Sequence, residues 1–103
     1  ANPFNSLGIR MRRDGDYPGA IRAYHKAIDL TPNDEHIYFN LARAYYFMGD
    51  EASALEQVSM ALRMNSRFPE ALNLYKEIRG INWPKEQSQG QNGARVKPAV
   101  DLG

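Results

Sequence analysis

The sequence contains one pattern twice, at an offset of 34 residues. Residues 15–28 read GDYPGAIRAYHKAI, and residues 49–62 read GDEASALEQVSMAL. Gly15-Asp16 therefore aligns with Gly49-Asp50, and Ala27 aligns with Ala61. Large apolar residues elsewhere in the pattern align with large ones. Close helix crossings need small side chains at fixed points, so this agreement in size predicts a repeated packing interface.

Each copy is predicted to form two antiparallel helices. Apolar residues in the first half recur at i, i+3, i+4 and i+7, which is one face of a helix: Phe4, Leu7, Gly8 and Met11. Gly15 can adopt the left-handed conformation that ends a helix, and Asp16 is placed to cap the next one. The buried stripes predicted for the three following helices are Ala20, Tyr24, Ala27 and Ile28, then Tyr38, Leu41, Ala42 and Tyr45, then Ala54, Val58, Ala61 and Leu62.

This period and residue order resemble a known family. A 34-residue helix-turn-helix unit with aromatic, Leu, Gly or Ala, Tyr, Ala, aromatic, Ala and Pro in this order is similar to the tetratricopeptide repeat (TPR). The resemblance covers repeats at residues 1–34 and 35–68 and a capping helix at 69–80, which together form a domain at 1–80. It implies an all-α, right-handed superhelical stack of five antiparallel helices, near residues 3–14, 17–31, 35–48, 51–64 and 69–79.

The last predicted helix carries more apolar residues than a terminal helix needs. Its apolar side chains cover about half of the helix surface, whereas a capping helix is expected to be polar on its outer side. After residue 80 the chain is rich in Gln, Gly, Ser and Pro, so residues 81–103 are predicted to form a largely flexible tail. Three alternatives could cover this surface: Ile81 and Trp83 folding back over the helix, a second copy of the protein in a homodimer, or the rest of a longer parent chain. The residues proposed for self-association are Leu72, Leu74, Tyr75, Ile78 and Trp83.

No motif for catalysis, a metal or a cofactor is found. The chain has no Cys, its two His residues form no metal-binding motif, and no Gly-Lys-Ser/Thr phosphate loop occurs. We therefore expect no enzyme activity, no metal and no cofactor. The absence of Cys fits either redox compartment, so localisation stays open.

The charge balance argues against nucleic-acid and membrane partners. The formal net charge is +1, and no apolar run approaches the ~20 residues of a membrane span. Nucleic-acid binding through a basic cluster is one alternative function. That cluster is Arg10, Arg12, Arg13, Arg22 and Lys26. Asp14, Asp16 and Asp29 dilute it, which favours a protein partner.

A second stripe on the helix at 35–48 predicts a binding surface. Phe39, Arg43, Tyr46 and Phe47 lie roughly 130° from the buried stripe, and aromatic and Arg residues are enriched at binding hot spots. The alternative is that Phe39 and Tyr46 pack between repeats. In the TPR family the first helices of the repeats line a concave groove. The groove residues that this implies are Asn5, Ile9, Arg12, Arg13, His36, Phe39, Asn40, Arg43, Tyr46, Phe47, Asn73 and Glu77.

One TPR subclass binds a C-terminal carboxylate with a two-carboxylate clamp, and this chain departs from it. The clamp positions hold Asn5, Ile9, Asn40, Glu70 and Leu74, of which only Asn40 matches. The prediction is therefore a non-catalytic protein-protein interaction module. Its ligand would be a peptide with an apolar anchor between Phe39 and Phe47 and acidic groups near the arginines. The alternative is a structural, self-associating module whose groove is incidental.

Overall fold

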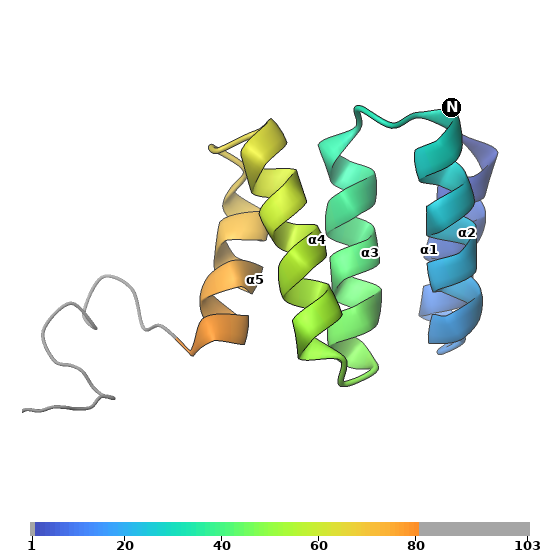
Figure 1. The fold of residues 1–103 in the computed structure, drawn as a ribbon. Helices are drawn as coiled ribbons and strands as arrows, with labels where there is room; N and C mark the ends of the chain where they lie inside the picture. Colours follow the sequence, from blue (N-terminus) through green and yellow to red (C-terminus); the bar gives the residue numbers. More distant parts are fainter. Residues whose placement is uncertain (1, 81–103) are drawn as a thin grey trace, which may run out of the picture.

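The computed structural model describes residues 2–80, and this part of the chain contains five α-helices and no strand. They are α1 (Pro3–Arg13), α2 (Tyr17–Leu30), α3 (Glu35–Phe47), α4 (Glu51–Met64) and α5 (Pro69–Arg79). The helices stand side by side in chain order, each antiparallel to the next (Figure 1). The predicted all-α stack is confirmed, and every predicted helix boundary lies within one residue of the observed one.

The predicted tail at 81–103, with Ile81 and Trp83, lies outside the described residues, and the domain boundary at residue 80 stays a prediction. Within residues 2–80, none of the helices has both the length and the apolar character needed to cross a membrane.

The two copies of the repeat turn between their helices in the same way. Gly15 and Gly49 adopt φ values of 84° and 88°, the left-handed conformation that favours glycine. The carboxylate of Asp16 then accepts a hydrogen bond from the Gly19 amide at 2.9 Å. Asp50 accepts one from the Ser53 amide at 3.1 Å. The repeated Gly-Asp pair is therefore a helix end followed by a helix cap, as the sequence predicted.

Asn2 fixes the start of α1 against the end of α2. Its side-chain oxygen accepts hydrogen bonds from the amides of Phe4 and Asn5 at 3.1 and 3.2 Å. Its side-chain nitrogen donates to the Ala27 carbonyl and to Thr31 Oγ1, both at 2.9 Å. One residue thus caps α1 and closes the first helix pair.

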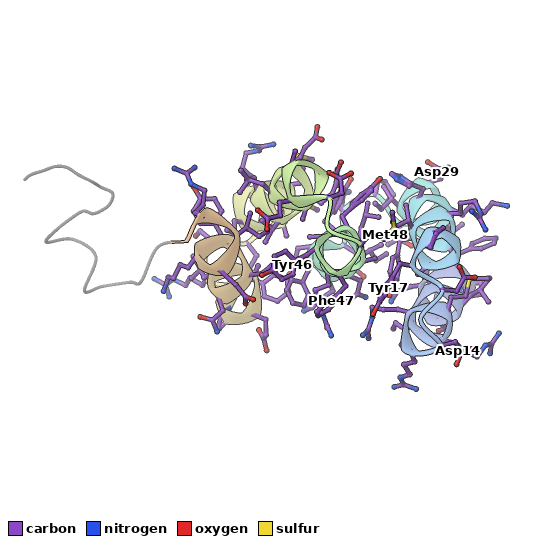
Figure 2. All side chains as sticks on the ribbon, turned by 90° about the horizontal axis from the view of Figure 1, so that it is seen from below. Asp14, Tyr17, Asp29, Tyr46, Phe47 and Met48 are labelled. Carbon is purple, nitrogen blue, oxygen red and sulfur yellow. The ribbon has the colours of Figure 1, made fainter. Side chains whose placement is uncertain are left out.

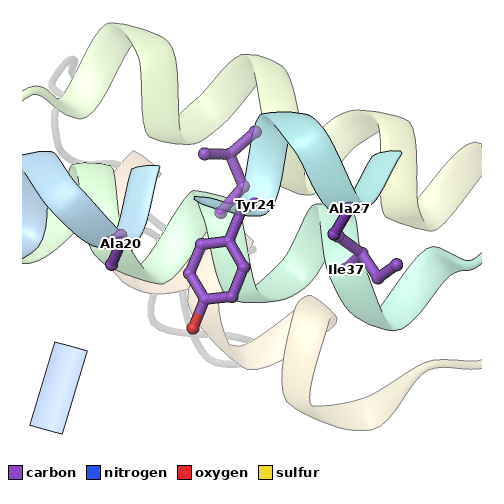
Figure 3. Close-up of a cluster of buried hydrophobic side chains, with 6 residues drawn as sticks. Ala20, Tyr24, Ala27 and Ile37 are labelled. Atoms are coloured by element: carbon purple, nitrogen blue, oxygen red, sulfur yellow. The ribbon is translucent and has the colours of Figure 1, made fainter. Parts of the chain in front are cut away.

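The buried side chains form two clusters. The first core cluster joins α2 to α3 and consists of Ala20, Tyr24, Ala27, Ile37, Leu41 and Ala44 (Figure 3). The second core cluster joins α3 to α4 and α5 and consists of Ala42, Val58, Ala61, Phe68, Ala71 and Leu74. Helix α3 contributes to both clusters and is the shared wall between them.

This position of α3 corrects the predicted buried stripe. Leu41 and Ala42 are buried as expected, but Tyr38 and Tyr45 are only half-buried. Ile37 and Ala44 are fully buried in their place. Helix α3 faces two clusters rather than one, because α2 packs on one of its sides and α4 with α5 on the other.

Helix α1 packs closely because it carries a glycine opposite a large ring. A Cβ atom at Gly8 would lie 2.5 Å from Cε1 of Tyr24. The Tyr24 ring therefore lies directly against the α1 backbone. It is fully buried, and its hydroxyl points away from α2 (Figure 3).

Candidate peptide-binding groove

Helices α1, α3 and α5 lie along the lower side of the stack in Figure 2. A cleft of about 270 Å³ lies between α3 and α5. Figure 2 shows Tyr46 and Phe47 of α3 facing the space between α5 and α1. The residues that line the cleft are Phe39, Arg43, Tyr46, Phe47, Glu70, Asn73, Leu74 and Glu77. Six of them were predicted as groove residues, and Glu70 and Leu74 are additions.

Phe47 is the exposed aromatic residue of the cleft. Its side chain is 56% exposed. Its ring centroid lies 6.0 Å from that of Tyr17 and 5.8 Å from that of Tyr46. Tyr17 begins α2 and was not predicted to lie here, because nothing in its local sequence links it to a residue of another helix. The three rings form a row along one end of the groove.

Phe39 serves both packing and the cleft. Its ring centroid lies 5.1 Å from that of buried Phe68, and it packs against the second core cluster. The guanidinium of Arg43 lies 5.4 Å from the centroid of the Phe39 ring. The alternative that Phe39 packs between repeats is therefore correct in part, since the same ring also lines the cleft.

Tyr46 spans the cleft to α5. Its hydroxyl donates a hydrogen bond of 2.7 Å to Oε2 of Glu77. This hydrogen bond, with burial and the negative charge of Glu77, raises the pKa of Tyr46 above its usual value. The contact joins the repeat that contains α3 to the capping helix.

The predicted residues of α1 lie along its seam with α3. Asn40 donates a hydrogen bond of 3.0 Å from Nδ2 to Oδ1 of Asn5. Ile9 packs against the first core cluster, Arg12 is half-buried, and Arg13 is exposed. These residues do not line the cleft between α3 and α5, so the predicted groove divides into a cleft and a seam.

His36, predicted as a groove residue, and the acidic residues beside it take other roles in the structure. The His36 ring centroid lies 4.9 Å from that of Phe68, and His36 does not line the cleft. Asp34, Glu35 and His36 bring potential metal-ligand atoms within 4.8 Å of one another. The Asp34 carboxylate already accepts the His36 amide at 2.9 Å, so helix capping accounts for the position of this carboxylate.

The residues proposed for self-association are not equivalent. Leu74 is only 8% exposed and belongs to the second core cluster. Its inclusion among the self-association residues is therefore corrected, because this side chain packs inside the domain. Leu72, Tyr75 and Ile78 are half-buried on α5. Trp83 lies outside the described residues.

Comparisons with known proteins agree with this architecture. Residues 11–49 match the family described as TPR repeat. A tetratricopeptide repeat and J domain-containing co-chaperone of Cryptococcus neoformans is 39% identical over 62 residues, which are 60% of this chain and 12% of that protein. The photosystem I assembly protein Ycf3 of Synechococcus elongatus is 35% identical over 69 residues, which are 64% of this chain and 40% of that protein.

A solved structure shares the fold. The first TPR of Spaghetti (RPAP3), bound to the HSP90 peptide SRMEEVD, superposes with a TM-score of 0.73 at 24% identity, covering 76% of this chain and 62% of that one. The chain spans 12% and 40% of the lengths of the two curated relatives above. The repeated sequence, the stack of antiparallel helices and these similarities together show that the chain belongs to the tetratricopeptide-repeat family.

Proposed function

We propose that this chain is a protein-interaction module without chemistry of its own, and that it binds a peptide segment of a partner protein in the groove of α1, α3 and α5. The observation that carries the proposal is Phe47. A side chain of this size that stays 56% exposed at the edge of a cleft gains little for the fold, but it is well placed to hold an apolar ligand group.

The size of the cleft favours a peptide over a small molecule. A volume of about 270 Å³ is smaller than the ~300–1,000 Å³ of typical small-molecule pockets. It suits one or two side chains of an extended chain whose remainder lies along the α1–α3 seam. The related fold of Spaghetti carries a bound peptide, SRMEEVD, which supports this kind of ligand for a groove of the same architecture.

The mode of binding differs from the two-carboxylate clamp. Asn5 and Asn40 are hydrogen-bonded to each other, and Glu70 lines the cleft where the clamp requires a cation. A carboxylate at that point would meet a like charge. Arg12 and Arg43 offer cations elsewhere in the groove, so we assign the acidic groups of the ligand to that side.

Peptide selection on the full chain tests the proposal. Twelve-residue random peptides displayed on phage would be selected against the protein, and the dissociation constant of the best binder would be measured for variants. Phe47→Ala should weaken binding by about tenfold or more, as expected of a hot-spot aromatic. Leu30→Ala is the matched control, because Leu30 is 59% exposed but lies on α2 and does not line the cleft.

A negative result is equally clear. If the selected peptide binds Phe47→Ala and Arg43→Glu as tightly as it binds the unmodified protein, the groove is not the binding surface. Amide resonances locate the bound peptide directly. We expect the peptide to shift the amide resonances of Phe39, Arg43 and Phe47 before the amide resonance of His25, which is exposed on α2.

A further inference from the structure

The end of the stack formed by α1 and α2 carries a second groove, which the proposed function does not use. Figure 1 shows α1 and α2 at one end of the row of helices and α5 at the other. A cavity of about 210 Å³ lies along the seam between α1 and α2. Its lining residues are Phe4, Leu7 and Met11 of α1 and Gly19, Arg22, Ala23 and Lys26 of α2. None of them lines the cleft between α3 and α5. We call this surface the end groove.

The end groove continues to the last turn of α2. A second cavity, of about 300 Å³, is lined by Phe4, Lys26, Asp29 and Leu30, so it shares two lining residues with the first. The Leu30 side chain is 59% exposed. From Gly19 to Leu30 helix α2 rises by about 16 Å, or about three turns. The end groove is therefore long enough for a helix of about eleven residues.

The end groove faces away from α3. On α2, the residues of the first core cluster are Ala20, Tyr24 and Ala27. The α2 residues that line the end groove are centred roughly 120° from these three around the helix axis. Among the helices of residues 2–80, α1 contacts only α2 and α3. No helix of this part of the chain therefore covers the end groove.

The second repeat shows which kind of element fits this position. At the offset of 34 residues, Leu7 and Met11 of α1 correspond to Leu41 and Tyr45 of α3. Leu41 is fully buried in the first core cluster, to which α2 contributes. Tyr45 packs against the same cluster, and its hydroxyl lies 3.2 Å from Nε2 of His25 on α2. A helix thus covers in the second repeat the positions that half-buried Leu7 and Met11 leave partly open in the first. The occupant that fits the end groove is therefore a helix.

The charges of the end groove favour an acidic helix. Arg22 and Lys26 are exposed one turn apart on α2, and neither has an ion-pair partner among residues 2–80. Lys26 Nζ lies 5.9 Å from the centroid of the Phe4 ring, so this charge lies beside the apolar wall of the groove. Asp29 adds one negative charge at the far end. A helix with acidic side chains beside its apolar stripe would complement both cations.

A second copy of the chain fits the end groove less well. Two end grooves packed against each other would bring Arg22 and Lys26 of both copies together, and like charges repel. Leu72 of α5 shares a helix face with Lys76 and Arg79, at i, i+4 and i+7, so α5 of another copy would also bring positive charges. Charge complementarity therefore favours another protein as the occupant.

We propose that the end groove binds an amphipathic helix of a partner protein, in which large apolar residues recur at i, i+3 and i+7 and Asp or Glu residues lie beside them. The apolar residues pack on Leu7, Met11 and Leu30, and the acidic residues lie at Arg22 and Lys26. This surface is separate from the cleft of the proposed function, so one module can join two protein segments.

Selection of helical peptides against the full chain tests the proposal. A phage library of short helices, each with a fixed stripe of Leu residues and with all other positions varied, would be selected against the protein. The best binders should be rich in Asp and Glu beside the stripe. With ¹³C-labelled methionine methyl groups in the protein, they should shift the Met11 resonance saturably. The resonance of Met64, which is exposed on α4, should stay unchanged.

Reversal of the two charges is the decisive change. Arg22→Glu combined with Lys26→Glu should weaken binding of a selected acidic helix by about tenfold or more, because attraction becomes repulsion at two points. Both side chains are exposed, so the fold is retained. Arg63→Glu combined with Arg67→Glu makes an equal charge change at exposed positions away from the end groove and should leave binding unchanged. Phe47→Ala should also leave it unchanged, since Phe47 lines the cleft.

Several results would overturn the proposal. They are a selection that yields no helix able to shift the Met11 resonance, binders without an excess of Asp and Glu, or an affinity that the charge reversal leaves unchanged. A Met11 resonance that moves with protein concentration alone would show that a second copy occupies the end groove, and a partner helix would then be the wrong occupant.

Discussion

Tyr24 combines two roles at the scale of a single residue. Its ring fills the space opposite Gly8 and belongs to the first core cluster, whereas its hydroxyl has no partner among residues 2–80. Burial raises the pKa of Tyr24 above its ordinary value, so the side chain is a neutral phenol at physiological pH. The ring therefore stabilises the fold, and the hydroxyl opposes it.

Removal of this hydroxyl should stabilise the protein. We expect Tyr24→Phe to raise the free energy of unfolding by about 1 kcal/mol, because an unsatisfied buried polar group is lost while the ring remains. Urea unfolding followed by circular dichroism measures the change. Tyr45→Phe is the control: the Tyr45 hydroxyl lies 3.2 Å from His25 Nε2, so its loss should give no such gain. A less stable Tyr24→Phe would show that the hydroxyl has a favourable partner.

The residue scale is also where prediction from the sequence reaches its limit. Periodicity placed Tyr24 correctly in a buried stripe, since spacing along one helix decides which face is covered. The approach of its ring to Gly8 joins two helices, and no pattern within one helix encodes it. The contact of Tyr17 with Phe47 escaped prediction for the same reason.

At the scale of the helices, small residues set the distances between neighbours. Ala27 and Ala61 occupy the same position in the two repeats, and both are fully buried. This agreement allowed the helix pairs to be predicted, because turn residues and small residues recur at one offset. The rotation of α3 was predicted less well. Ile37 and Ala44 of α3 are fully buried because α3 has helices packed on two of its sides. The sequence of α3 alone does not show how many helices pack against it.

Enlarging these alanines should separate the helices. Ala27→Leu and Ala61→Leu should each lower the free energy of unfolding by roughly 1–3 kcal/mol, because a close-packed interface cannot accept the larger side chain. Thermal unfolding of the two variants measures this. Ala52→Leu on the exposed side of α4 should change stability little. Two neutral results at Ala27 and Ala61 would contradict the helix packing described here.

The stability that the Tyr46–Glu77 hydrogen bond gives to the contact between α3 and α5 should depend on pH. The hydrogen bond to Glu77 raises the pKa of Tyr46 in the folded state, so this bond stabilises the fold below the unfolded-state pKa of about 10. Its contribution is lost as the pH rises through the higher folded-state value. We therefore expect stability to fall more steeply above about pH 10 in the unmodified protein than in Tyr46→Phe. If chemical unfolding shows that the free energies of unfolding of the two proteins fall in parallel above about pH 10, this expectation is wrong.

At the scale of the whole molecule, charge and apolar surface are arranged along the stack. Arg12 and Arg43 lie on α1 and α3, the aromatic residues follow, and Glu70 and Glu77 lie on α5. The groove residues implied by the family resemblance include Arg12 and Arg43, Phe39 and Phe47, and Glu77, which follow this order of basic, aromatic and acidic groups. The sequence could not predict that Leu74 is part of the domain core. The apolar residues of α5 cover about half of the helix, and their spacing alone does not show which of them face the other helices.

Self-association through α5 stays a prediction, and Leu72 tests it better than Leu74. Leu74→Glu would destabilise each single domain, whereas Leu72 is half-buried and outside the second core cluster. We expect sedimentation across a concentration series to show a dimer that Leu72→Glu weakens and Met64→Glu, a change on exposed α4 surface, does not. A single monomeric species at all concentrations would exclude the dimer.

The contacts between helices have a consequence for the order in which the protein is made. Every pair of helices in contact is adjacent in the chain or separated by one helix. The first core cluster draws only on α2 and α3, with α1 packed beside it, so all its residues have been synthesised once α3 is complete. Such local contacts form rapidly compared with the ~5–20 residues added per second during translation. We therefore expect the first core cluster to close before α5 docks, so that the cleft that needs α5 forms last.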